Sequence, residues 1–414
     1  MLNSESNNTF CTVPWFEVHI NADGSYHTCG MQHNWISGTD LAKEYNVQVL
    51  NIADWMSSKF MYTDRYNKLA GIKDLHCNSC YATECGGGSS KRVRENLKSK
   101  IHNRKKVFPL TFAHSPDRVV LTNPTLSTVN IRSFHLSLGN ECNLYCRTCD
   151  PSYSSRIAFM EKANPVRLNW TDNNQAWDHV VDSIVSAPDL QFVHIIGGEP
   201  MLTPRFEELI DALIAAGKTD TYFGFCTNGT IYREELFAKL QQFRHVDVGI
   251  SMESTTILND FIRAGSSTQD VIANIKKIQK FQAENYYVTL RPVISALSVH
   301  TYDQTLQWAL DNNLGILSNT LDQPGNMQVH QLPSDVKTRL INKFSAWPYS
   351  NLMDIHTNGR EPEHQKLQAD NEMRSVINML HQPNDPAVTD ALYAKLQGWN
   401  WFKTEEIRNY FYLD

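Results

Sequence analysis

Three closely spaced cysteines, Cys142, Cys146 and Cys149, are the residues of this 414-residue chain best suited to bind a metal cluster. They follow a strand-like run, so a single loop can carry three thiolates to one face of a cluster. With nine cysteines in the chain, this spacing would arise by chance about 0.004 times. A 4Fe-4S cluster normally takes four cysteines, so three would leave one iron open to another ligand. The alternatives are three unconnected buried thiols or a zinc knuckle, although zinc usually requires a fourth Cys or His close by.

A Gly-Gly-Glu turn stands at the end of the next expected strand. Gly197, Gly198 and Glu199 precede Pro200 there. Two glycines let backbone groups approach a ligand closely, and the carboxylate can receive an ammonium group. Alone, this is an ordinary tight turn. Its position after the strand that follows the cysteine loop makes it a specific signal.

Together the two motifs resemble the radical S-adenosylmethionine (SAM) enzymes. The resemblance implies that SAM chelates the open iron through its amino and carboxylate groups, and that the Gly-Gly-Glu turn holds the amino group. It also implies that the cluster splits SAM into methionine and a 5′-deoxyadenosyl radical, which takes hydrogen from a substrate. The later positions that match SAM-binding residues of the family are Asn228, Ser251, Glu253 and Arg263. The resemblance implies that Ser251 and Glu253 contact the ribose hydroxyls of SAM and that Arg263 reaches its carboxylate.

The cysteine loop departs from the commonest family pattern at one position. An aromatic residue often precedes the third cysteine, and here Thr148 stands in that place, with Tyr145 before the second cysteine. In the family the backbone at this position contacts adenine, so the resemblance makes Tyr145 and Thr148 cofactor-binding candidates. We expect the change to affect packing and not the reaction.

A second group of cysteines lies near the amino terminus. The element Gly24-x4-Cys29 and the later Cys77-x2-Cys80 resemble the auxiliary-cluster module called SPASM, or its shorter form, twitch. The resemblance implies one auxiliary 4Fe-4S cluster held by Cys11, Cys29, Cys77 and Cys80. Zinc fits this count equally well.

Two cysteines and several histidines remain outside these sets. Cys85 is an exchangeable ligand, a resolving thiol or a buried residue, and we expect Cys226 to be a small core residue. Histidines lie in or beside the expected strands, but none has a paired ligand spacing, and we expect them to be structural or surface residues. These histidines are His19, His27, His76, His135 and His194.

The elements that must position these residues alternate between strand and helix from residue 131 onward. This alternation predicts an α/β fold, a partial (β/α)6 barrel with its active site at the carboxyl ends of the strands. The expected strands are Ser133–Leu138, Phe192–Ile196, Tyr222–Cys226, Val246–Met252, Val288–Ile294 and Ile316–Leu321. The expected helices are Gln175–Ala187, Arg205–Ala216, Arg233–Phe243, Gln269–Glu284 and Thr301–Asn312.

Three domains are expected along the chain. Residues 1–130 would form the small auxiliary-cluster domain, which metal rather than a large core holds together. Residues 131–330 would form the radical SAM partial barrel. Residues 331–414 would form a helical carboxy-terminal region that packs on the barrel.

Composition and charge exclude several other classes. The net charge of −6 provides no basic field for nucleic acid or an anionic membrane. No signal peptide or membrane span is expected, which predicts a cytoplasmic location where cysteines bind metal rather than form disulfides.

The resemblance also suggests partners and a substrate. It implies a flavodoxin- or ferredoxin-type electron donor, and the auxiliary module favours a peptide or protein side chain as substrate, altered by crosslinking, thioether formation, epimerisation or oxidation. A sugar, nucleotide or other small molecule is the alternative substrate. The alternative class is a non-catalytic iron-sulfur electron-transfer or metal-binding scaffold.

Overall fold

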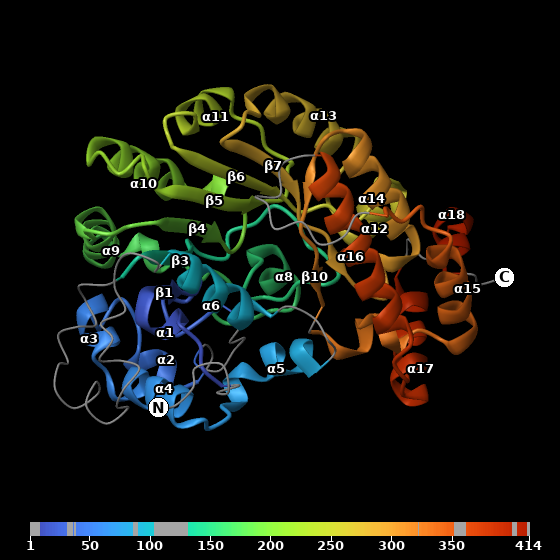
Figure 1. The fold of residues 1–414 in the computed structure, drawn as a ribbon, viewed down its shortest axis with the longest axis horizontal. Coiled ribbons are helices and arrows are strands. Elements are labelled where there is room, and N and C mark those ends of the chain that lie inside the picture. Colours follow the sequence, from blue (N-terminus) through green and yellow to red (C-terminus); the bar gives the residue numbers. More distant parts are fainter. Residues whose placement is uncertain are drawn as a thin grey trace. The chain divides into compact units, whose positions relative to one another are not determined.

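The computed structural model describes residues 9–30, 36, 39–85, 90–102, 131–321, 323–351, 362–399 and 404–411, and Figure 1 shows the fold. Two compact units divide the chain. The first consists of Met1–Glu141, Arg167–Gly198 and Thr203–Phe223, and the second of Cys142–Val166, Glu199–Leu202 and Gly224–Asp414.

The first unit is built on mostly parallel strands. Its strands are β1 (Glu17–Ile20), β2 (Tyr26–His27), β3 (Ser133–Ser137), β4 (Phe192–Ile196) and the first two residues of β5 (Tyr222–Thr227). β1 pairs antiparallel with β2 and parallel with β3, and β3 pairs parallel with β4. The longer helices of this unit are α3 (Ile52–Met56), α4 (Lys59–Ala70), α5 (Asn78–Cys85), α6 (Lys91–His102), α9 (Asn174–Ser186) and α10 (Pro204–Ala215), and the short helices are α1 (Val13–Phe16) and α2 (Leu41–Glu44).

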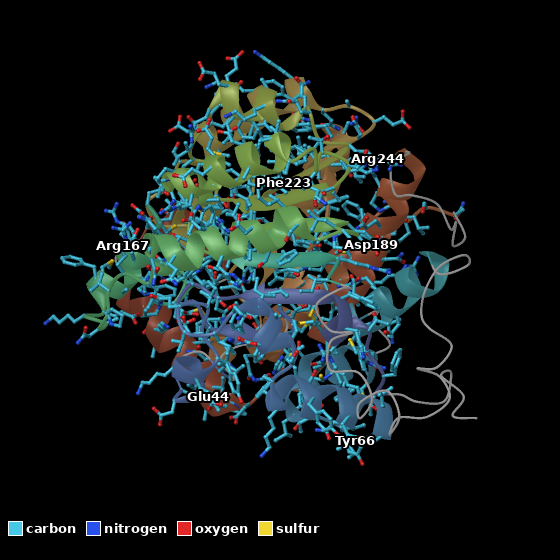
Figure 2. The ribbon with its side chains drawn as sticks, turned by 90° about the vertical axis from the view of Figure 1, so that its left-hand side faces the viewer. Glu44, Tyr66, Arg167, Asp189, Phe223 and Arg244 are labelled. Atoms are coloured by element: carbon cyan, nitrogen blue, oxygen red, sulfur yellow. The ribbon has the colours of Figure 1, made fainter. Side chains whose placement is uncertain are left out.

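Alternating burial along the strands places the core of the first unit. On β3, Phe134 and Leu136 are fully buried, whereas His135 between them is half-buried. This period of two means that one strand face packs into an apolar core while the other carries polar side chains. On the apolar side, the rings of Phe206 and Phe223 lie 6.1 Å apart. Figure 2 shows Phe223 among tightly packed side chains.

The second unit contains the remaining parallel strands. They are the end of β5, β6 (His245–Ile250), β7 (Tyr286–Leu290), β9 (Gly315–Ile316), and the short parallel pair β8 (Val293–Ile294) and β10 (Asn319–Thr320). The helices are α8 (Ser155–Met160), α11 (Glu234–Leu240), α12 (Ile257–Ile262), α13 (Thr268–Ile278), α14 (Tyr302–Asp311), α15 (Ser334–Ser345), α16 (Pro362–Leu380), α17 (Pro386–Gly398) and α18 (Glu405–Tyr410).

The structure confirms the predicted fold class, a mostly parallel α/β fold followed by a helical carboxy-terminal region. Helix α10 lies within one residue of its predicted bounds because Thr203 caps it and Pro204 begins it, with the Thr203 hydroxyl accepting a hydrogen bond from the backbone N–H of Arg205. The predicted strands at Val288–Ile294 and Ile316–Leu321 are each split into two shorter strands. The sequence predicted no strand before residue 131, yet β1 and β2 are present there. The three-domain division stays a prediction, and the two compact units follow other boundaries.

Two further findings concern the membrane and the cysteines. Within the described ranges, no helix is both long enough and apolar enough to cross a membrane.

All nine cysteines belong to the described ranges, and each one is a free thiol.

A buried histidine of the second unit predicts a pH dependence of stability. Burial lowers the pKa of His300 to about 4, opposed by its hydrogen bond with the Ala296 carbonyl. In the unfolded chain this histidine titrates near pH 6.5. The neutral, buried form therefore contributes fully to the unfolding free energy above that pH, and the contribution is lost as the pH falls toward 4. Between pH 7 and pH 5, the wild type should lose about 2 kcal/mol more unfolding free energy than His300→Gln. Urea unfolding at the two pH values measures this, and equal losses would contradict it.

Candidate functional site

The predicted cysteine loop is held by backbone bonds to a distant segment of the second unit. The backbone N–H of Tyr145 donates to the carbonyl of Ala264 at 3.0 Å, and that of Arg147 to the carbonyl of Ile262 at 2.8 Å. Within the loop, the hydroxyl of Ser154 donates to the Leu144 carbonyl at 2.7 Å. Hydrogen bonds therefore hold the loop at Tyr145 and Arg147 and again at Ser154, just before α8.

Arg147, which the sequence did not mark as functional, fastens the loop to α12. Its Nε donates to the carbonyl of Phe261 at 2.8 Å. Its guanidinium lies 4.5 Å from the centre of the Phe261 ring and 4.3 Å from that of Trp399. These cation–π contacts add to the hydrogen bond, so Arg147 orders the loop without facing the thiols.

The three thiols are partly buried and have N–H donors beside them. Asn228 Nδ2 lies 4.0 Å from Cys142 Sγ, and Arg263 Nη1 lies 3.8 Å from Cys146 Sγ. Burial raises the pKa of all three thiols, that of Cys146 to about 11. Cys142 raises the pKa of Cys146 further, and both raise that of Cys149. Proteins hold iron-sulfur clusters through cysteine thiolates, often with hydrogen bonds to the sulfurs. This loop offers three such thiols, and two of them have N–H donors beside them. The residues therefore fit the cluster.

Glu199 is a buried carboxylate that three donors of the second unit orient. Its oxygens accept from the backbone N–H of Asn228 at 2.7 Å, the Thr227 hydroxyl at 2.8 Å and the backbone N–H of Met201 at 3.2 Å. Burial raises the pKa of Glu199, while these hydrogen bonds lower it. The carboxylate is 2% exposed and fixed in one position, as a receptor for an ammonium group must be.

The two glycines before it are required by close packing within the first unit. Gly197 has φ +113°, and a Cβ there would lie 2.2 Å from Ser137 Oγ. A Cβ on Gly198 would lie 2.1 Å from the carbonyl oxygen of Glu141 and 2.8 Å from the carbonyl carbon of Asn140. Both glycines therefore pack closely against the protein itself, and their cofactor-binding role stays a prediction.

Gly198→Ala should destabilise the protein, because its neighbours are backbone atoms that cannot rotate away. We expect a loss of about 1–3 kcal/mol of unfolding free energy. Urea denaturation measures it, with Gly398→Ala as the control, because a Cβ there meets no atom of the described residues within 4 Å. Equal midpoints for the two variants would show that the chain relaxes at Gly198 without cost.

Arg263 and Glu253 form a buried, two-pronged ion pair. Arg263 Nε and Nη2 each donate to a different carboxylate oxygen of Glu253, the second bond at 3.1 Å. Burial alone would lower the pKa of Arg263, but Glu253 and Cys146 hold it above its usual value. Glu253 is 1% exposed, and both of its oxygens are engaged by the arginine. Glu253 thus holds the guanidinium of Arg263, whose Nη1 lies beside Cys146 Sγ.

Asn228 belongs to a small polar network that the sequence revealed only in part. Its Nδ2 donates to Asn143 Oδ1 at 2.8 Å, and its Oδ1 accepts from the backbone N–H and the hydroxyl of Thr230 at 2.9 and 2.6 Å. Asn143 Nδ2 donates to the same hydroxyl at 2.9 Å. Asn143 and Thr230 were missed, since nothing in their spacing connects residues 87 positions apart.

The remaining predicted cofactor residues lie on the same unit as the thiols. Ser251 directly follows β6, and its backbone N–H donates to the Thr227 carbonyl at 2.9 Å. The Tyr145 ring lies 5.5 Å from the guanidinium carbon of Arg156. Thr148 is half-buried in a turn of the cysteine loop. The cofactor-binding roles of these three residues stay predictions.

Neighbouring groups shift the pKa values of two amino-terminal cysteines of the first unit, Cys11 and Cys77. Burial and then the nearby Cys29 raise the pKa of Cys11, and Cys77 adds a smaller rise. Burial raises the pKa of Cys77 to about 11, with Lys68 opposing the shift and Cys80 adding to it. Cys29 and Cys77 thus act on Cys11, and Cys80 acts on Cys77. Four cysteines are a ligand number that suits either an iron-sulfur cluster or zinc.

The two leftover cysteines differ from these four. Cys85, the last residue of α5, is exposed. Cys226 lies on β5 and is half-buried, and burial raises its pKa. The alternative that Cys85 is a buried residue is therefore wrong, because its side chain is exposed.

Comparison with known proteins assigns a class to one segment. The profile of the Radical SAM superfamily matches residues 136–309, which include the cysteine loop, Glu199 and Arg263. This segment, less than half of the chain, is thereby assigned as a radical SAM domain. No curated protein matches the chain.

Several solved structures resemble the chain at low identity. The structure of native anSMEcpe with bound AdoMet is 17% identical over 52% of this chain and 60% of that chain, with a TM-score of 0.41. SuiB of Streptococcus suis is 14% identical over 69% of this chain and 60% of that chain, with a TM-score of 0.36. TYW1 with a lysine-pyruvate adduct bound is 14% identical over 62% of this chain and 83% of that chain, with a TM-score of 0.31. The chain thus spans 60% of the length of the first two proteins.

Proposed function

We propose that the protein is a radical SAM enzyme that reductively cleaves SAM and takes hydrogen from a substrate. One observation carries the proposal: the three-thiol loop has Arg263 3.8 Å from Cys146 Sγ and Asn228 4.0 Å from Cys142 Sγ. The backbone N–H of the same Asn228 orients the buried Glu199. A cation, a carboxylate and three thiols are therefore held in one connected set.

Each residue of this set has a role that its contacts support. Cys142, Cys146 and Cys149 would hold a 4Fe-4S cluster, while Glu199 and Arg263 would receive the amino and carboxylate groups of SAM. When bound, this cofactor supplies the one-electron chemistry that removes hydrogen from an unactivated carbon. The protein's own part is to orient these charged groups and to keep them from water, which strengthens their interactions.

Product analysis tests this proposal. Anaerobically reconstituted protein, given dithionite and SAM, should form 5′-deoxyadenosine and methionine in equal amounts. Intact SAM after incubation with iron-loaded protein would contradict it. If calorimetry then also showed no SAM binding, the chain would instead be a non-catalytic iron-sulfur scaffold.

For the substrate, we propose a peptide or protein side chain, on the basis of the amino-terminal resemblance to the auxiliary module. Anaerobic incubation with candidate peptides should give a mass change of two hydrogens or a crosslink. Peptides deuterated at the reacting carbon should transfer deuterium into 5′-deoxyadenosine. Transfer only from a sugar, a nucleotide or another small molecule would contradict the peptide assignment and leave SAM cleavage intact.

The amino-terminal cysteines are proposed to hold an auxiliary 4Fe-4S cluster through Cys11, Cys29, Cys77 and Cys80. Their support is the burial of Cys11 and Cys80, which are 6% and 7% exposed, and the effect of Cys29 and Cys77 on the pKa of Cys11. A variant lacking the three loop cysteines should still bind about four irons and four sulfides. Zinc without sulfide in that variant would contradict the auxiliary cluster. A flavodoxin- or ferredoxin-type donor in the cytoplasm is the proposed source of electrons.

A further inference from the structure

Four histidines form a row across neighbouring strands of the first unit. The strand register pairs His19 with His27 and with His135, and it pairs His135 with His194. Directly paired residues point to the same face of a sheet. The ring centres are 5.9, 6.1 and 5.4 Å apart along the row. Histidines that are far apart in sequence are therefore side by side.

A buried carboxylate joins the middle of this row. Glu17 precedes His19 by two positions on β1, which places both side chains on the same face. One ligand atom each of Glu17, His19 and His135 lies within 4.8 Å of the other two. His135 Nε2 is 3.1 Å from Glu17 Oε2. Glu17 is 4% and His19 3% exposed.

Among the residues that the structure describes, none is a hydrogen-bond partner for one buried nitrogen of His19. His19 Nε2 lies 2.9 Å from Asn21 Oδ1, and Asn21 Nδ2 lies 2.8 Å from His27 Nε2. With the Asn21 amide oriented this way, its oxygen accepts from His19 Nε2–H. The lone pair of His19 is then on Nδ1, the atom that lacks a partner. Leaving such an atom buried is costly, and a histidine that binds a metal usually donates its other ring N–H to an acceptor of this kind.

We propose that Glu17, His19 and His135 form a binding site for a divalent transition-metal ion, with zinc as the best match. Two imidazoles and one carboxylate are ligands that zinc accepts, with a further position left for water or another ligand. Lys91 Nζ lies 2.7 Å from Glu17 Oε1, so the ion would bind Oε2. Metal binding would displace the proton between His135 Nε2 and Glu17 Oε2, because an imidazole nitrogen that binds a metal must offer its lone pair. None of these ligands is a cysteine, although Gly30, the residue after Cys29, packs against the His19 ring. The site does not depend on SAM cleavage.

Zinc binding to cluster-loaded protein tests the site. After equilibrium dialysis of the reconstituted full chain against Zn²⁺, metal analysis should find one more zinc per chain in the wild type than in His19→Gln or His135→Gln. The iron content should be equal in all three. His194→Gln is the matched control, because it removes the next imidazole of the row outside the ligand set and should keep the extra zinc. Equal zinc in the wild type and both ligand variants would overturn the proposal.

X-ray absorption at the zinc edge of the wild type provides a test that needs no variant. Nitrogen and oxygen ligands at about 2.0–2.2 Å are expected. Sulfur ligands alone, at about 2.3 Å, would place the zinc on cysteines and overturn the proposal. Either outcome leaves the assay for 5′-deoxyadenosine untouched, so failure here is distinct from failure of the proposed function.

Discussion

Cys146→Ala is expected to reduce the formation of 5′-deoxyadenosine to the background of the assay. The loop offers three thiols for a cluster, and Cys146 is the one beside the Arg263 guanidinium. With two thiols left, we expect the loop to lose its cluster and the reconstituted chain to contain about four fewer irons. Iron analysis and chromatography of the anaerobic reaction measure both effects.

Cys85→Ala is the matched control for this substitution. Cys85 is an exposed cysteine of the first unit and belongs to neither ligand set. It should keep the wild-type iron content and the wild-type yield of 5′-deoxyadenosine. If Cys146→Ala behaved like this control, the loop could not be the site of SAM cleavage.

Glu253→Gln is expected to weaken SAM binding about 10- to 100-fold while leaving the iron content unchanged. The glutamine has one acceptor oxygen instead of two and no charge, so the Arg263 fork loses its partner and its fixed position. Hydrogen bonds to charged groups contribute about 1.5–3 kcal/mol, and each 1.4 kcal/mol corresponds to about a factor of ten. Calorimetric titration of the reconstituted variant with SAM measures the change.

A second ligand separates two roles for Glu253. If Glu253 acts through Arg263, the variant should bind 5′-methylthioadenosine, which lacks the amino and carboxylate groups, as well as the wild type does. A ribose contact, which the family resemblance implies, would weaken both ligands equally. Glu208→Gln, which breaks the partly exposed pair with Arg205, should change neither affinity. Undiminished SAM binding by Glu253→Gln would contradict both roles.

The sequence predicted the parts of the site that depend on local spacing. The three cysteines share one loop, and Glu199 follows the end of β4 by three positions, so neither required knowledge of distant contacts. The strand and helix alternation predicted the parallel fold for the same reason, since each crossover unit is local in sequence. Helix α10 was predicted to within one residue because a threonine cap and a proline mark its start.

Long-range contacts could not be predicted from one sequence. Arg147 and Phe261 are 114 positions apart, and nothing in their spacing connects them. Strand β1 has only four residues, too few for a periodic signal, and its pairing with β3 spans more than a hundred positions. The histidine row depends on this register, so histidines without paired spacing were expected to be structural. Glu253 and Arg263 were each predicted as ligand contacts, and their mutual pairing emerged only in the folded chain.

The most direct test of the central claim compares SAM cleavage by the wild type with that by the variant in which Cys142, Cys146 and Cys149 are all alanine. Both proteins are reconstituted anaerobically and incubated with dithionite and SAM, and 5′-deoxyadenosine is quantified by mass spectrometry. We predict product from the wild type and none from the variant, even where the variant retains iron at its amino-terminal cysteines. Equal product from the two proteins would contradict the account.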